Sequence, residues 1–274
     1  MIESPSKSQG IPQGERWLPI QKYALAMSGD AQWQPAGAGI EQRDLGLGRA
    51  SEGAMRARQL RAAGGDAILT QAPDAEGAHF HLFYVIKGRV TLAGDDGRRV
   101  ELNAGDCIHQ PALTRRNVVT LSAATQVLEL TVPITPSVSG KAFALEPAAQ
   151  AAQPVVNRDV ASAYVRGDGP RAYFLYRDLG VASATDGRIH IHILKATAPS
   201  MPGGTGTHTH TMCQLFYVFS GWADLEVAGQ KTVRMHGEDA MCITAGSAHN
   251  VPAFSEDYAI IEVCIPAKYN TVDV

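Results

Sequence analysis

The chain has 274 residues, of which 45% are hydrophobic and 19% charged, and its formal net charge at pH 7 is −3. This near-neutral charge, without a run of basic residues, argues against a nucleic-acid partner. No apolar stretch approaches the roughly 18 residues that a membrane span needs. The length and composition predict a globular protein of two domains that acts on or binds a small molecule.

Residues 1–39 are set apart as an N-terminal extension. Residues 1 to 15 are rich in Ser, Pro, Gln and Gly and lack the apolar core of a signal peptide, so we expect a cytoplasmic protein. The stretch from Trp17 to Trp33 is apolar without a clean period. An exposed apolar segment of this kind is unusual in a monomer, and we expect it to pack against its own domains or a second subunit.

Residues 40–135 show the pattern of a β domain. Short apolar runs such as Leu82-Phe-Tyr-Val-Ile86 alternate with turn signals such as Gly94-Asp-Asp-Gly97, which favour antiparallel hairpins. The regular strand spacing predicts an all-β sandwich or barrel. Residues 136–169 are rich in Ala, Pro and Gln and are interpreted as a linker. The strand pattern returns in residues 170–268, and residues 269–274 form a tail.

An internal repeat relates the two β regions. His81-Leu-Phe-Tyr-Val85 matches Gln214-Leu-Phe-Tyr-Val218 at a spacing of 133 residues. The same spacing relates further identical residues, namely Gly88 and Gly221, Val100 and Val233, Asp106 and Asp239, Glu129 and Glu262, and Pro133 and Pro266. Arg43-Asp-Leu-Gly46 matches Arg177-Asp-Leu-Gly180 at a spacing of 134. A near-constant spacing over such a length indicates two copies of one folding unit.

The second copy carries the residues with the clearest chemistry. His208 and His210 lie two apart, so on a strand both imidazoles share one face, and Gln214 has the same parity. His249 follows a turn-rich crossing and can approach from a neighbouring strand. Three imidazole nitrogens and one amide oxygen suit a divalent first-row transition metal. We therefore predict one metal site made by His208, His210, Gln214 and His249, in which Gln214 either binds the ion or supports three imidazole ligands from behind.

These patterns resemble the two sequence motifs of the cupin family. The first motif corresponds to His208, His210, Gln214 and Gly221; the second to Glu238-Asp239, Thr244, Gly246 and His249. Gln214 stands where the family usually has Glu, Thr244 where it has Pro, and Glu238 where it has Gly. The resemblance implies an all-β protein of two tandem cupin barrels, each a double-stranded β-helix of the jelly-roll type, with the metal inside the second barrel.

The first copy differs at the metal positions. His208, His210 and His249 correspond to Ala75, Gly77 and Arg116, and His81 occupies the position of Gln214. We therefore expect a metal-free N-terminal barrel. His79-Phe-His81 offers an alternative pair of ligands, and a metal bound there would show that this alignment is wrong.

The resemblance implies several functions. Cupins include dioxygenases that cleave diketones, flavonols and aromatic acids such as gentisate, and also isomerases, lyases, storage proteins and sugar sensors, and fold alone does not select one. Our first hypothesis is a non-haem metal-dependent dioxygenase acting on a small, anionic, oxygen-rich molecule, with iron as first candidate and manganese, nickel or zinc as alternatives. The second is a metal-dependent isomerase or lyase acting on a sugar-like or carboxylate substrate; the third is a non-catalytic ligand-binding cupin. The resemblance also favours a homodimer.

Two residues are candidates for acid–base catalysis. His190 and His192 share one strand face and isoleucines occupy the other, so either the histidines are exposed or one of them faces the site. Glu262 is a carboxylate within an apolar strand, and it is either a structural ion-pair partner or a pocket acid–base group. We name His190 and Glu262 as the catalytic candidates.

Overall fold

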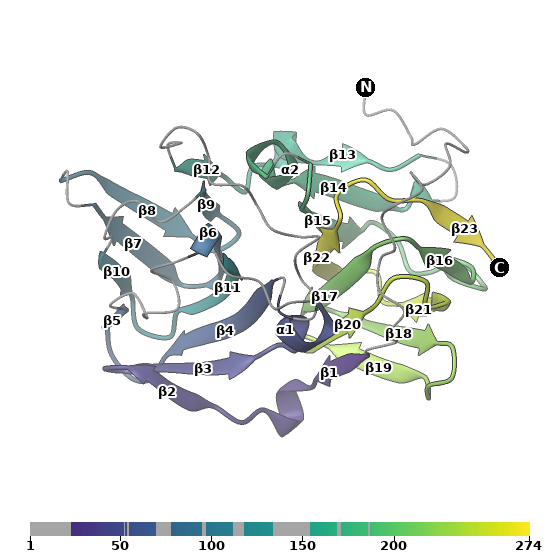
Figure 1. Cartoon of the computed structure of the whole chain (residues 1–274), viewed down its shortest axis with the longest axis horizontal. Helices are drawn as coiled ribbons and strands as arrows, with labels where there is room; N and C mark the ends of the chain where they lie inside the picture. Colours follow the sequence, from purple (N-terminus) through teal and green to yellow (C-terminus); the bar gives the residue numbers. More distant parts are fainter. Residues whose placement is uncertain are drawn as a thin grey trace.

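The computed structural model describes residues 23–51, 53, 55–69, 78–94, 97–111, 118–133, 154–168, 171–185 and 187–274. These residues form two β-barrel units side by side, one drawn mainly in purple and blue and the other mainly in green and yellow (Figure 1). The predicted all-β fold of two tandem barrels is confirmed. None of the helices in the described ranges is long and apolar enough to span a membrane.

The N-terminal barrel pairs a larger antiparallel sheet with a smaller one. The larger sheet has seven described strands in the order β12 (Val155–Asn157), β9 (Cys107–Pro111), β6 (Ala78–Lys87), β11 (Gln126–Pro133), β4 (Arg56–Ala62), β3 (Ile40–Asp44) and β2 (Gln34–Gly37). The smaller sheet has the order β5 (Ala67–Leu69), β10 (Val118–Leu121), β7 (Arg89–Ala93) and β8 (Arg99–Asn103).

The C-terminal barrel repeats this plan. Its larger sheet has the order β1 (Ala24–Ala26), β20 (Ala240–Ile243), β17 (Cys213–Ser220), β22 (Ala259–Ile265), β15 (His190–Ala196), β14 (Phe174–Asp178) and β13 (Val165–Arg166). Its smaller sheet has the order β19 (Val233–His236), β18 (Trp222–Val227), β21 (His249–Phe254), β16 (His208–His210) and β23 (Thr271–Asp273). Short 3-10 helices at Ser28–Asp30 and Ala161–Ala163 follow β1 and β12.

The two larger sheets pack against each other, and this explains the continuous apolar runs of the repeat. In β17, Leu215 and Tyr217 belong to the cluster between the barrels, whereas Phe216 and Val218 fill the interior of the C-terminal barrel. A strand buried on both faces needs apolar residues at successive positions rather than at alternate ones. The four cysteines are free and buried, as expected for thiols of the core.

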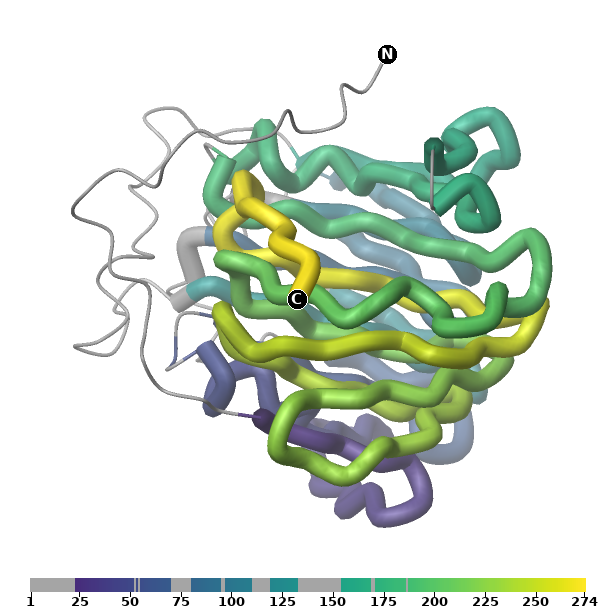
Figure 2. Tube along the Cα trace, turned by 90° about the vertical axis from the view of Figure 1, so that its right-hand side faces the viewer, coloured from purple at the N-terminus to yellow at the C-terminus, as the bar shows by residue number. Residues whose placement is uncertain are grey.

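The barrels exchange their leading strands. Strand β1 precedes the N-terminal barrel in sequence but pairs with β20 of the C-terminal barrel, and β12 pairs with β9 of the N-terminal barrel. Figure 2 shows the purple β1 segment along the edge of the C-terminal unit. The repeated aspartates hold these crossings. Asp239 Oδ1 accepts a hydrogen bond from the Ser28 amide at 2.7 Å, and Asp106 Oδ1 accepts one from the Asp159 amide at 3.0 Å.

The repeated Arg-Asp-Leu-Gly motif ends the strands β3 and β14. Asp44 Oδ1 accepts a hydrogen bond from the Gly46 amide at 2.9 Å, and Asp178 repeats this contact with Gly180 at 2.8 Å. Both glycines have positive φ angles, which glycine adopts without steric cost, and each opens a one-turn helix: α1 (Leu47–Ala50) and α2 (Val181–Ala184). The arginine of the motif crosses to the other barrel, because Arg177 Nη2 donates to the Gly105 carbonyl at 2.6 Å and Arg43 Nη2 donates to that of Glu238.

Strands also occur in the segments that flank the two predicted barrels. Strands β1 and β2 lie within residues 1–39, β12 and β13 within residues 136–169, and β23 within residues 269–274. Of the apolar stretch from Trp17 to Trp33, residues 17–22 lie outside the described part, and Ala24–Ala26 pairs within the chain. The exact domain boundaries stay a prediction.

Candidate metal centre

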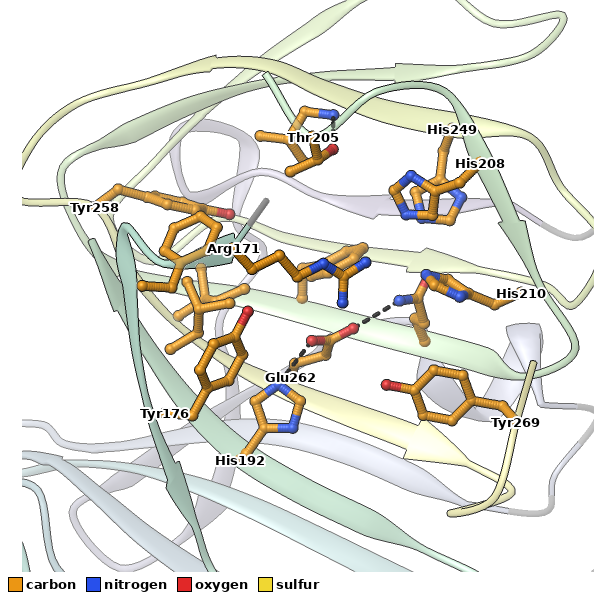
Figure 3. A pocket seen from close by; sticks show the side chains of 16 residues that line it. Arg171, Tyr176, His192, Thr205, His208, His210, His249, Tyr258, Glu262 and Tyr269 are labelled. Atoms are coloured by element: carbon orange, nitrogen blue, oxygen red, sulfur yellow. Dashed lines mark hydrogen bonds and ion pairs between the residues drawn. The ribbon is translucent and has the colours of Figure 1, made fainter. Parts of the chain in front are cut away.

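Three histidines from two paired strands of the C-terminal barrel lie close together. His208 and His210 lie on β16, and His249 lies opposite His208 on β21 in the antiparallel register. The ring centroids lie 4.7 Å apart for His208 and His210, 4.5 Å for His208 and His249, and 5.1 Å for His210 and His249. Their ligand atoms lie within 4.8 Å of one another, and all three side chains are buried. Figure 3 shows the three rings gathered on one side of the cavity.

Each histidine has one ring nitrogen engaged by a fixed partner. His208 Nδ1 donates to the Gly206 carbonyl at 2.7 Å, and His249 Nδ1 donates to the Ser247 carbonyl at 2.9 Å, since a carbonyl oxygen only accepts. His210 Nδ1 lies 2.8 Å from the Thr271 hydroxyl on β23. In His208 and His249 this leaves Nε2 as a free acceptor, the arrangement found in metal-binding histidines with an oriented second nitrogen. The Thr271 hydroxyl can donate or accept, and when it accepts from Nδ1 it leaves His210 Nε2 free in the same way.

Burial favours the neutral form of two of the imidazoles, those of His249 and His210. It lowers the pKa of His249, and it lowers the pKa of His210 to about 3 although the negative charge of Glu262 opposes the shift. The glycine-rich loop before β16 is packed tightly against β21, since a Cβ on Gly204 would lie 1.8 Å from the Val251 carbonyl oxygen. The loop therefore holds the Gly206 carbonyl in place for His208.

Gln214 connects the histidines to a buried ion pair. Its Nε2 donates to Glu262 Oε1 at 2.6 Å, and His192 Nε2 lies 2.8 Å from Glu262 Oε2. Burial alone would raise the pKa of Glu262, but the contacts with His192 and Gln214 and the nearby His210 lower it to about 2. Because the amide nitrogen of Gln214 faces Glu262, its amide oxygen is the atom left for another partner.

A cavity of about 90 Å³ adjoins the three histidines. Apolar side chains line one part of it: Phe174, Leu194, Phe216, Val251 and Ile260. Polar side chains line the other: Arg171, Tyr176, Thr205, Tyr258 and Tyr269. Figure 3 shows the Arg171 guanidinium pointing into the middle of the cavity, between the imidazoles and Glu262. Its positive charge lowers the pKa of both His210 and His249.

Comparison with known proteins agrees with this architecture. Residues 67–132 match the cupin domain family model, and no curated protein matches the sequence. Among solved structures, Bacillus subtilis oxalate decarboxylase, which contains Mn(II) centres, has a TM-score of 0.59 at 12% identity, covering 91% of this chain and 79% of its own. Residues 67–132 therefore belong to the cupin domain family, and the chain as a whole shares the fold of this structure.

Two further structures align with this chain over nearly their whole length. A protein described as glyoxylate-induced, from Pseudomonas aeruginosa, has a TM-score of 0.64 at 13% identity and covers 98% of this chain and 95% of its own. Ylba from E. coli has a TM-score of 0.61 at 16% identity and covers 93% of this chain and 96% of its own. At these identities the likeness shows the shared fold.

The structure brings five of the six predicted site residues to one cavity and places the sixth outside it. His208, His210, Gln214, His249 and Glu262 all line the one cavity. His190 does not line it: its side chain is 25% exposed, and its Nδ1 lies 3.8 Å from an oxygen of Asp178. The histidine beside Glu262 is His192, on the same face of β15. The isoleucines of β15 pack between the two barrels, and His192 on the opposite face lines the cavity. Both faces of the strand are therefore covered, which the sequence alternatives did not include.

The sequence reading missed Arg171, Tyr176 and Tyr269. None belongs to a motif: Arg171 precedes β14, and Tyr269 lies in the connection between β22 and β23. Burial raises the pKa of Tyr269 and raises that of Tyr176 to about 12. Only the folded arrangement brings these side chains to the cavity.

A second group of ligand-type side chains lies behind the first. His192, Glu262 and Cys264 have ligand atoms within 4.8 Å of one another. Burial raises the pKa of the Cys264 thiol well above its ordinary value, and His192 and Glu262 are paired with each other. A protonated thiol is a poor metal ligand, so this group supports the site rather than forming another.

The N-terminal barrel replaces this arrangement with an ion-pair network. Glu129, equivalent to Glu262, lies between His81, whose Nε2 is 2.8 Å from its Oε1, and Arg58, which contacts its other oxygen. His81 thus contacts Glu129 as Gln214 contacts Glu262, in agreement with the repeat alignment. Ala75, Gly77 and Arg116 lie outside the described residues, as does the side chain of His79.

Glu129 should make stability depend on acid pH. Burial alone would raise its pKa, but His81 and Arg58 lower it from 4.5 to about 2. A carboxyl with a lowered folded-state pKa contributes stability that is present above about pH 4.5 and lost as the pH falls toward 2. The full contribution is about 3 kcal/mol. Urea unfolding should show Glu129→Gln less stable than wild type at pH 7, with a difference that shrinks below pH 4.5. A constant difference across this range would contradict the ionised carboxylate.

Proposed function

We propose that His208, His210 and His249 bind one divalent transition metal through Nε2, with the Gln214 amide oxygen as fourth ligand. The observation that carries this proposal is that all three imidazoles have Nδ1 engaged and converge from two paired strands. Neutral, buried imidazoles are the form that binds metals. Iron remains our first candidate, and manganese, nickel and zinc are the alternatives.

The residues present fit such an ion. Nitrogen and amide oxygen donors suit first-row divalent metals, and four protein ligands leave positions for a substrate. Gln214 brings no charge, but Glu262 places a carboxylate one hydrogen bond behind it. When bound, the metal would supply Lewis-acid and redox chemistry and would polarise an oxygen-rich anion.

We propose that the substrate is a short carboxylate whose negative charge pairs with Arg171. A guanidinium binds a carboxylate through two parallel hydrogen bonds, and this one points into the cavity beside the imidazoles. The cavity of about 90 Å³ exceeds the roughly 10–15 Å³ that one water molecule needs, and it suits a molecule of few non-hydrogen atoms. The apolar wall would keep water away from the reacting atoms.

The acid–base groups favour metal-based oxidation over proton transfer. A carboxylate with a pKa of about 2 is a weak base at neutral pH, so Glu262 serves better to orient Gln214 and His192 than to abstract a proton. Tyr176, with a pKa of about 12, is a poor acid. We therefore propose a non-haem metal-dependent dioxygenase of a small carboxylate, with His190 having no contact to the cavity that would support a catalytic role.

A lyase is the second candidate, because the His192–Glu262 pair lines the same cavity and a decarboxylase shares the fold. An oxygen electrode separates the two. Iron-loaded protein with oxalate, glyoxylate and pyruvate should consume dioxygen in proportion to substrate loss. Substrate loss with carbon dioxide release and no net dioxygen consumption would favour the lyase, and no turnover of a wider carboxylate panel would favour a binding protein.

We also propose a homodimer. Val155, Val160 and Val165, on or near β12 and β13, are each at least 45% exposed, and together they offer apolar surface for a second subunit. Light scattering at micromolar concentration should give about twice the chain mass of 29.2 kDa. A mass of one chain would contradict the dimer. Residues 23–33 would then contribute only to packing within the chain, where Ala24–Ala26 pairs with β20.

A further inference from the structure

A second, larger cavity lies in the N-terminal barrel, apart from the candidate metal centre. Its volume is about 640 Å³, within the usual range of 300–1,000 Å³ for small-molecule sites. Strands β2, β3, β4 and β11 and helix α1 contribute its described lining. The charged side chains of that lining are Arg43, Arg49, Arg56 and Arg58, against Asp44 and Glu129. Arginines therefore outnumber carboxylates among the described residues of the lining.

The arginines of the lining differ in whether they have an ion-pair partner. Arg58 is neutralised by Glu129 and also donates to Gln42 Oε1 at 2.5 Å. Asp44 accepts the Gly46 amide in the turn before α1. Arg49, exposed at the end of α1, makes no ion pair with any residue that the structure describes. It is thus one source of unbalanced charge at the cavity.

Arg43 is the other source, and it is buried, with 4% of its surface exposed. Its hydrogen bonds to described residues go to neutral acceptors: Nε donates to Gln59 Oε1 at 2.7 Å, and Nη2 donates to the Glu238 carbonyl. Its Nη1 has no hydrogen-bond partner in the described part of the chain. No carboxylate of the described residues lies within ion-pair distance of this guanidinium. A buried guanidinium without an ion-pair partner is costly, because the lost hydration is only partly replaced.

In the other copy of the repeat, the equivalent arginine has a carboxylate partner. Arg177, equivalent to Arg43, lies 2.6 Å from the carboxylate of Asp159. The residue equivalent to Asp159 is Ser28, because both follow the exchanged strand and both donate their amide to the repeated aspartate. The N-terminal copy therefore has a serine where the C-terminal copy has the neutralising carboxylate, and a cavity lies beside the unpaired arginine.

We propose that this cavity binds a small organic anion, with a carboxylate or phosphate group paired to Arg43 and Arg49. Guanidinium groups bind either group through parallel hydrogen bonds, and the ligand charge would replace the carboxylate that Asp159 supplies in the other copy. The site lies in the N-terminal barrel, away from His208, His210 and His249, and it does not depend on the proposed metal chemistry.

Isothermal titration calorimetry of the full chain with succinate and with inorganic phosphate tests this site. Arg49→Gln removes one proposed contact. Ser28→Asp installs the carboxylate of the other copy and should occupy Arg43. Each change should weaken binding of the preferred anion by about tenfold or more. Arg89→Gln, an exposed arginine on β7 of the same barrel, is the matched control and should leave the affinity unchanged. The lower dissociation constant, for succinate or for phosphate, identifies which group the site prefers.

His208→Ala separates this site from the metal centre. Anion binding that persists in His208→Ala and falls in Arg49→Gln supports the proposal, even if Ser28→Asp does not fold. Binding that is lost in His208→Ala would place the anion at the metal centre and overturn the proposal. The proposal would also be overturned if neither anion binds at millimolar concentration, or if Arg49→Gln binds the preferred anion as tightly as wild type does.

Discussion

Replacing His208 by Ala should abolish stoichiometric metal binding while leaving the fold intact. The substitution removes one of three converging imidazoles, and a divalent ion in a neutral ligand set depends strongly on each nitrogen. Affinity should fall by at least about 100-fold, because a ligand is lost outright whereas removing only a supporting contact already costs 10- to 100-fold. Metal titration of the chelator-treated protein, read by calorimetry, measures this change.

His236→Ala is the matched control. His236 is exposed on β19 of the same barrel and does not line the cavity. It should bind metal as wild type does, and circular dichroism should show both variants folded. Equal metal affinity in His208→Ala and wild type would mean that the ion binds elsewhere in the chain.

Replacing Arg171 by Gln should weaken binding of short carboxylates by about 100-fold, since the loss of two charge-assisted hydrogen bonds costs about 3 kcal/mol or more. Calorimetry of metal-loaded protein with oxalate and glyoxylate measures the effect. Arg171→Lys should recover only part of the affinity, because an ammonium keeps the charge but lacks the planar fork. Metal content should stay unchanged in both variants.

The control for this series is Lys268→Gln. Lys268 is an exposed cation next to Tyr269 but does not line the cavity. An equal loss of affinity in Lys268→Gln and Arg171→Gln would indicate a general electrostatic effect of the surface. Unchanged affinity in Arg171→Gln would contradict the proposed carboxylate contact.

The fold could be predicted from the sequence because the same structural residues occur in both copies of the repeat. Leu-Phe-Tyr-Val occurs in both copies since β6 and β17 are each buried on two faces, and Asp106 and Asp239 recur because each holds an exchanged strand. The spacing of His208, His210 and His249 was sufficient to predict that they meet, because strand parity and antiparallel pairing determine which side chains share a face.

The rest of the cavity could not be predicted from spacing alone. His192 rather than His190 contacts Glu262, and that choice depends on which end of β15 lies at the cavity. Arg171 comes from a connecting segment, where no periodicity relates a side chain to the site. The charge of Glu262 could be assigned to the site only once Gln214 was seen to hydrogen-bond to it.

The metal content of protein purified without added metal tests the central claim most directly. Inductively coupled plasma mass spectrometry should find about one transition-metal ion per chain in wild type, and almost none in His249→Ala, because His249 supplies a ligand from a different strand than His208 and His210 do. A metal-free wild type that also fails to take up iron, manganese, nickel or zinc would contradict the account, as would an ion that remains bound in His249→Ala.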